Sequence, residues 1–203
     1  MIDNGLKKYI EDFVLPHYKK NDKAHGAEHV MYVIERSVVL AKEHNADINM
    51  AYTAAALHDI GHYMDPANHE YISADIFLSD EFFKTVFSEE SRILIYKAIQ
   101  EHRSSHEKEL SSIFSKILST ADRTTNVKKA IQRSIDYNKW HCPDQSLDVY
   151  FENIIEYLTD KYGLNGYSQV HLKDNAYDLF IKEMQQLLLD KEKLEALILD
   201  LLP

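Results

Sequence analysis

The chain has 203 residues, 45% of them hydrophobic and 28% charged, so it can form one large folded domain and is not a disordered protein. A formal net charge of −10 argues against duplex nucleic acid as a partner, because a phosphate backbone needs a basic surface. No apolar run is long enough to span a membrane and no secretion signal opens the chain, so we expect a cytoplasmic protein.

Only 5 glycines and 4 prolines interrupt the chain, which favours long helices joined by short loops. Apolar residues at helical spacing predict about ten helices and no strand. The predicted helices cover residues 3–15, 25–40, 47–61, 67–78, a short piece from about 80, 88–102, 111–122, 127–140, 147–162 and 172–201. The fold class is therefore all-α. We expect a single domain, 1–203, with a core at about 20–125 and a helical C-terminal extension at about 126–203.

The most informative segment is 54–62, where His58 and Asp59 follow an apolar helical run. A buried carboxylate without a partner is costly, so such a group survives in a core mainly by pairing or by binding a metal ion. His29 lies upstream and Asp122 downstream, and each is embedded in an apolar helical pattern. Together these residues indicate a metal site between helices.

This order of residues resembles the HD-domain superfamily of metal-dependent phosphohydrolases, whose ligand order is His…His-Asp…Asp. The resemblance covers about residues 25–125 and implies an all-α HD-like bundle. It implies a divalent ion bound by His29, His58, Asp59 and Asp122. Two imidazoles and two carboxylates suit manganese, iron, cobalt or nickel, with zinc or magnesium as alternatives.

The number of ions depends on two further histidines. Some HD families bind a second ion through histidines between the His-Asp pair and the last aspartate, and His69 and His102 occupy approximately those positions. Asp59 would then bridge the two ions. Because the spacing only approximates that of the two-ion families, we expect one ion, with His69 and His102 otherwise lining the pocket.

The residues expected to act on the substrate are Asp59, His62, His102 and Arg123. His62 lies one helical turn after His58, and we interpret it as a contact of substrate phosphate rather than as a ligand. Arg123 follows the predicted ligand Asp122 and is expected to bind phosphate; an ordinary surface ion pair is the alternative.

Two other residues beside the predicted ligands have plainer alternatives. Arg103 follows His102 and would bind phosphate or form a surface ion pair. His25 precedes His29 by one turn, and we interpret it as a helix cap rather than as a residue that orients His29.

These features predict an enzyme in which metal-activated water attacks the phosphorus of a small phosphorylated metabolite, with a nucleotide as the first choice. The alternative is a non-catalytic module of the same fold that binds or senses a nucleotide. The last third of the chain carries a stripe of leucine and aromatic residues. This stripe either packs within the chain or forms a homodimer interface, and the sequence leaves both open.

Overall fold

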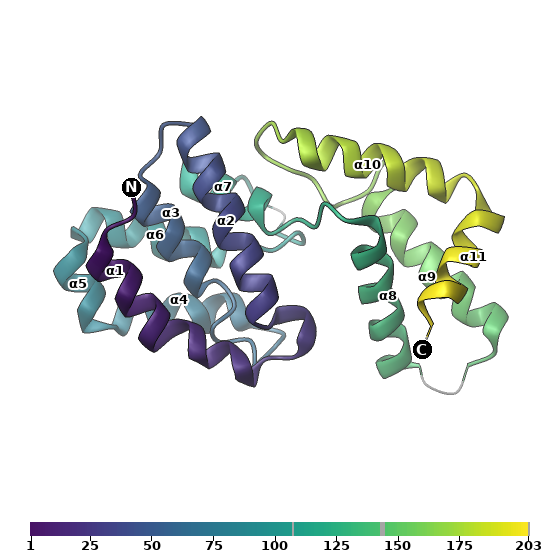
Figure 1. Cartoon of the computed structure of the whole chain (residues 1–203), viewed down its shortest axis with the longest axis horizontal. Coiled ribbons are helices and arrows are strands. Elements are labelled where there is room, and N and C mark those ends of the chain that lie inside the picture. Colours follow the sequence, from purple (N-terminus) through teal and green to yellow (C-terminus); the bar gives the residue numbers. More distant parts are fainter. Residues whose placement is uncertain (107, 143–144, 203) are drawn as a thin grey trace. The chain divides into compact units, whose positions relative to one another are not determined.

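Helices are the only regular elements in the computed structural model, which describes residues 1–106, 108–142 and 145–202 (Figure 1). The predicted all-α fold is confirmed. The chain divides into two compact units, Met1–Asp122 and Arg123–Pro203. No helix in the described residues is both long enough and apolar enough to cross a membrane.

The first unit contains helices α1 to α7 and three irregular helical segments between α1 and α2. Their bounds are α1 (Asn4–Tyr9), the π-helical η1 (Ile10–Val14), the 3₁₀ segments η2 (Leu15–Lys20) and η3 (Lys23–His25), α2 (Ala27–Glu43), α3 (Ile48–Leu57), α4 (His69–Ser79), α5 (Glu81–Val86), α6 (Glu89–Gln100) and α7 (Ile113–Ala121). Helix α3 lies at the centre, in contact with α2, α6 and α7. Every residue of α3 from Met50 onward is buried, as its nearly continuous apolar run requires.

Helix α3 ends at Leu57, earlier than the predicted end at Gly61, and turns follow it. The Tyr18 side chain explains the early end. Its hydroxyl donates to the Ala56 carbonyl over 2.9 Å and accepts from the Asp59 N–H over 3.3 Å. A side chain thus takes over backbone groups at the end of the helix. His58, the C-cap residue, keeps helical backbone angles, and Asp59 lies in the turns that follow, inside the core.

The N-terminal segment also departs from the prediction of one helix over residues 3–15. The α-helix ends at Tyr9, and the chain continues as η1 and then as η2, which has Pro16 in its first turn. Proline is tolerated there because the first turn of a helix has no partner for its missing N–H. The helical path therefore continues through Pro16, and Tyr18 lies in the core, where it is 1% exposed.

The second unit is built from α8 (Val127–His141), α9 (Leu147–Tyr162), α10 (Asn175–Leu188) and α11 (Lys191–Leu201). The prediction of one helix over 172–201 is wrong, because the chain breaks between α10 and α11. Asp190 caps α11 by accepting from the Lys193 N–H over 3.2 Å. Aspartate is a favourable N-cap and a poor interior helix residue, so it favours a break. Helix α11 then packs against α8 and buries Leu194 and Ile198.

Much of the C-terminal apolar stripe packs inside the second unit. The buried members of this core include Ile131, Ile154, Leu158, Phe180, Met184 and Leu187. Leu179 and Leu189 instead are 70% and 88% exposed. Core packing accounts for most of the stripe, and a homodimer remains a prediction.

Candidate metal centre

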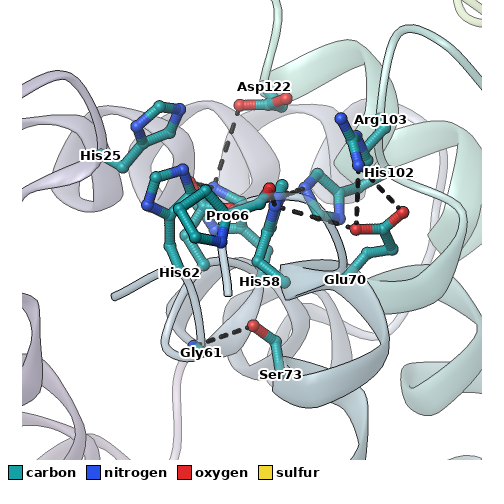
Figure 2. Close-up of polar contacts among 12 residues, drawn as sticks. His25, His58, Gly61, His62, Pro66, Glu70, Ser73, His102, Arg103 and Asp122 are labelled. Atoms are coloured by element: carbon teal, nitrogen blue, oxygen red, sulfur yellow. Dashed lines mark hydrogen bonds and ion pairs between the residues drawn. The ribbon is translucent and has the colours of Figure 1, made fainter. Parts of the chain in front are cut away.

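Four predicted ligands from three helices come together in the first unit, and we call them the first group: His29, His58, Asp59 and Asp122. His29 lies on α2, the His-Asp pair follows α3, and Asp122 follows α7. Figure 2 shows His58 and Asp122 of this group. The Nε2 atoms of His29 and His58 are 3.2 Å apart. Asp122 Oδ1 is 3.1 Å from His29 Nε2, and Asp59 Oδ2 is 3.1 Å from His58 Nε2.

His69 and His102 meet the other oxygen of Asp59, and we call these three residues the second group. His69 begins α4, and His102 lies just beyond α6. Their Nε2 atoms are 3.1 Å and 3.5 Å from Asp59 Oδ1 and 3.3 Å from each other. Asp59 Oδ1 is fully buried, and none of the described residues donates a well-aligned hydrogen bond to it. The two oxygens of one carboxylate therefore face two separate pairs of histidines.

Backbone carbonyls fix the orientation of three of these rings. Each Nδ1 contacts the carbonyl oxygen three residues earlier: His58 that of Ala55 at 2.8 Å, His69 that of Pro66 at 2.9 Å and His102 that of Ile99 at 2.6 Å. A carbonyl can only accept, so each of these rings carries a proton on Nδ1 and turns Nε2 toward the carboxylates. Nε2 can then bind a metal ion or, without one, hold a second proton: against the opposing effect of burial, Asp59 raises the pKa of His58 to about 9.

Converging lone pairs and carboxylates repel one another unless a positive charge, a proton or a metal ion, lies between them. Imidazole nitrogens and carboxylate oxygens are ligands for divalent transition metals, and a carboxylate can bridge two ions. The residues of both groups therefore fit a divalent ion.

The two aspartates keep their charge in this buried place. Burial by itself would raise the pKa of the Asp59 carboxyl, but the surrounding imidazoles, that of His58 foremost, hold it well below its usual range. His29 does the same for Asp122 against the opposing effect of burial. Both side chains are therefore carboxylates at neutral pH, the form that binds cations.

His62 belongs to neither group. Its buried ring stacks on that of His25, with 3.8 Å between the ring centroids and 19° between the planes, and Figure 2 shows both rings at one flank of the centre. Burial, followed by the nearby His25, lowers the pKa of His62 to about 4, so its ring is neutral at pH 7. The ring centroid lies 5.0 Å from that of His69, beside the second group. Its predicted contact with phosphate stays a prediction.

The two arginines differ in their surroundings. Arg123 is buried, and its Nε donates to the Gln169 carbonyl over 3.3 Å within the second unit, so its predicted phosphate contact stays untested. Arg103 donates through Nη1 to the Ala67 carbonyl over 2.8 Å and to both oxygens of Glu70 over 3.2 Å. Since Glu70 is buried, this is not the solvated surface pair that the sequence allowed.

Sequence reasoning missed Tyr18, Asp22 and Glu70, which contact the predicted site residues. Asp22 accepts from the His25 backbone N–H over 3.0 Å and lies within 2.9 Å of its Nδ1. An aspartate three residues before a histidine is a usable signal, because this spacing is typical of a capping turn. For Tyr18 and Glu70 the local sequence holds no comparable signal.

The chain is similar to known proteins in its fold and in one family pattern. A crystal structure of a "predicted HD superfamily hydrolase" from an uncultured Thermotogales bacterium is similar in fold, with a TM-score of 0.53 and 21% identity over 90% of this chain and 91% of that one. A search of curated proteins found no match. The model of the HD domain family matches residues 26–127, about half of the chain, and this stretch holds all six residues of the two groups. By that match, and with its His…His-Asp…Asp arrangement, the chain belongs to the HD-domain superfamily.

Proposed function

We propose that this protein is a hydrolase that cleaves a phosphate group from a small phosphorylated metabolite, with a nucleotide as the first choice, and that it works with two divalent ions. The observation that carries the proposal is that the two carboxylate oxygens of Asp59 face separate pairs of histidines. The sequence favoured one ion. The close approach of His69 and His102 to Asp59 Oδ1 supports two.

In this proposal the six residues of the two groups would hold the ions, and Asp59 would be common to both groups. Bound divalent ions lower the pKa of water and polarise phosphoryl oxygens. The protein keeps the bridging carboxylate charged and buried, and the backbone carbonyls hold His58, His69 and His102 in the ligand orientation. We infer that His62, whose ring lies beside that of His69, donates a hydrogen bond to a phosphate oxygen of the substrate. Burial, followed by the nearby His25, lowers its pKa to about 4, so the ring is neutral at pH 7.

Tyr63 supports a nucleotide as the substrate. It follows His62 in the chain and is 40% exposed, and Lys20 lies 4.8 Å from its ring centroid. An exposed aromatic ring can stack on a nucleobase, and a neighbouring ammonium group attracts phosphate. Both groups lie next to the segment that carries the centre.

The test is an assay of phosphate release from a panel of nucleotides and other phosphate esters, with manganese, iron, cobalt and nickel in turn. Asp59→Ala should abolish turnover and lower the amount of bound metal. Asp65→Asn is the matched control, since this half-buried carboxylate lies outside both groups and accepts from the Ala67 N–H and the Asn68 side chain. Normal turnover by the Asp59→Ala variant would contradict the proposal. Thermal stabilisation by a nucleotide without turnover, across the whole panel, would instead support a non-catalytic binding module.

A further inference from the structure

Each histidine of the first group has another histidine one helical turn away along the chain. His25 precedes His29 by four residues, and His62 follows His58 by four. The inner pair meets at the carboxylates of the first group. The outer pair stacks ring on ring, 3.8 Å apart, and a third aspartate faces it. We call Asp22, His25 and His62 the outer group.

The nitrogen and oxygen atoms of the outer group are close enough to share one ion. His25 Nδ1 lies 2.9 Å and 3.1 Å from the two oxygens of Asp22, and His62 Nδ1 lies 3.8 Å from Oδ2. One ligand atom from each residue can be chosen so that all lie within 4.8 Å of one another. Both rings thus turn the same nitrogen toward one carboxylate.

The three side chains of the outer group differ in exposure, from one that is mostly in solvent to one that is buried. The side chains of Asp22, His25 and His62 are 55%, 35% and 8% exposed. An ion here would have three protein ligands and water on its open side. The His62 ring also adjoins the second group through His69, so such an ion would add positive charge where an anionic substrate approaches the centre.

Asn21 joins the two chain segments that carry the outer group. Its side-chain amide donates over 2.9 Å to the carbonyls of His25 and Asp59, and its carbonyl accepts from the Tyr63 N–H over 3.0 Å. The two histidines are therefore held in register by a third residue. Such preorganisation is what a ligand set requires, and a chance pair of surface histidines would lack it.

We propose that Asp22, His25 and His62 form a third, solvent-facing binding site for a divalent transition-metal ion. Two imidazoles and one carboxylate favour manganese, iron, cobalt, nickel or zinc over magnesium, which prefers oxygen ligands. Because its aspartate is 55% exposed and its open side faces water, this site binds its ion more weakly than the buried groups do. The inference concerns binding alone and does not depend on the reaction proposed above.

The test is a count of manganese ions per chain by equilibrium dialysis, together with anomalous scattering from crystals of the full chain. We expect a third ion at saturating manganese, next to the two central ones. Magnesium alone should not fill this position. Asp22→Asn and His25→Gln should each remove the third ion and leave the central ions in place.

Asp47→Asn is the matched control. Asp47 caps α3 by accepting from the N–H groups two and three residues ahead, as Asp22 does for η3, and it has no histidine beside it. Asparagine caps about as well as aspartate, so both variants should fold. Central ions without a third one in the wild type would overturn this inference and leave the hydrolase proposal intact. A third ion that persists in Asp22→Asn would overturn it as well.

Discussion

The number of ions in the centre depends on whether His69 is a ligand. It contacts Asp59 Oδ1, whereas the first group keeps its own pair of histidines on Oδ2. We predict that His69→Gln lowers the metal content of the loaded protein from two central ions to one. Metal analysis of the dialysed protein measures this, with the exposed His17→Gln as control. Loss of both central ions, or of neither, would contradict the division of Asp59 between two sites.

Gly61 sets how closely the turn after the His-Asp pair approaches α4. A Cβ atom at this position would lie 2.6 Å from Ile72 Cγ2 and 3.0 Å from the backbone nitrogen of Ser73. The Gly61 N–H also donates to Ser73 Oγ over 3.0 Å, so the turn cannot move away freely. Only a residue without a side chain fits.

We therefore predict that Gly61→Ala lowers the free energy of unfolding by about 1–3 kcal/mol, the usual cost of overpacking a core. Urea denaturation measures this change. Gly5→Ala serves as the control, because the nearest atom to its new methyl group belongs to the Asp3 side chain, at 3.2 Å. Equal stability of the two variants would show that the turn yields to the methyl group.

At the scale of elements, Arg103 and Glu70 join the ends of two helices that supply the second group. Glu70 lies next to His69 on α4, and Arg103 follows His102 beyond α6. The guanidinium group also holds the Ala67 carbonyl just before α4. This contact fixes the spacing of the two histidines, so Glu70 and Arg103 are positioning residues.

Glu70→Gln should therefore weaken binding of the ion in the second group about 10- to 100-fold, as the loss of residues that support ligands does elsewhere. Binding in the first group should not change, and this selectivity separates positioning from general damage to the fold. Isothermal titration with manganese resolves the two steps. Glu81→Gln, at an 82% exposed side chain, is the control. An equal loss at both steps would rule out the positioning role.

The order of the motifs along the chain predicted which helices would meet. An apolar helical run that ends in His58-Asp59 must lie in the core, because its side chains are too apolar to be exposed. Contacts between side chains of different elements were not predictable in the same way. Glu70 and Arg103 look like ordinary surface charges along the sequence, and only the approach of α4 to α6 makes them partners. The π-helical turn of η1 was missed because no local helix preference distinguishes it from an α-helix. The break at Asp190 had a local signal, the capping preference of aspartate, which the prediction of one helix did not use.

On the scale of the whole molecule, the six predicted ligands come from most of the longer helices of the first unit. They come from α2, from the ends of α3, α6 and α7, and from the start of α4. An ion that binds only the folded state stabilises it by mass action, by about 2.7 kcal/mol at a hundredfold excess over its dissociation constant. We predict that removal of metal with a chelator lowers the unfolding temperature of the first unit.

Scanning calorimetry with and without manganese measures this shift. The second unit contains none of the six ligands, so a transition that belongs to it should keep its temperature. Its core of residues such as Ile154 and Met184 gives it packing of its own. An unfolding curve that does not respond to metal at all would contradict a metal centre in the first unit.

The carbonyl groups that orient His58, His69 and His102 have one consequence for how this protein tolerates mutation. They belong to Ala55, Pro66 and Ile99, three residues whose apolar side chains differ in size and shape. Main-chain oxygens are present whatever the side chain, so no single amino-acid replacement can delete them. Sequence drift at these three positions can change the packing around the rings while each ring keeps its acceptor. The orientation of the three rings thus depends on the path of the main chain and not on the identity of the residues that supply the carbonyl groups. Replacement of those residues should preserve it, whereas replacement of a histidine removes the ring itself.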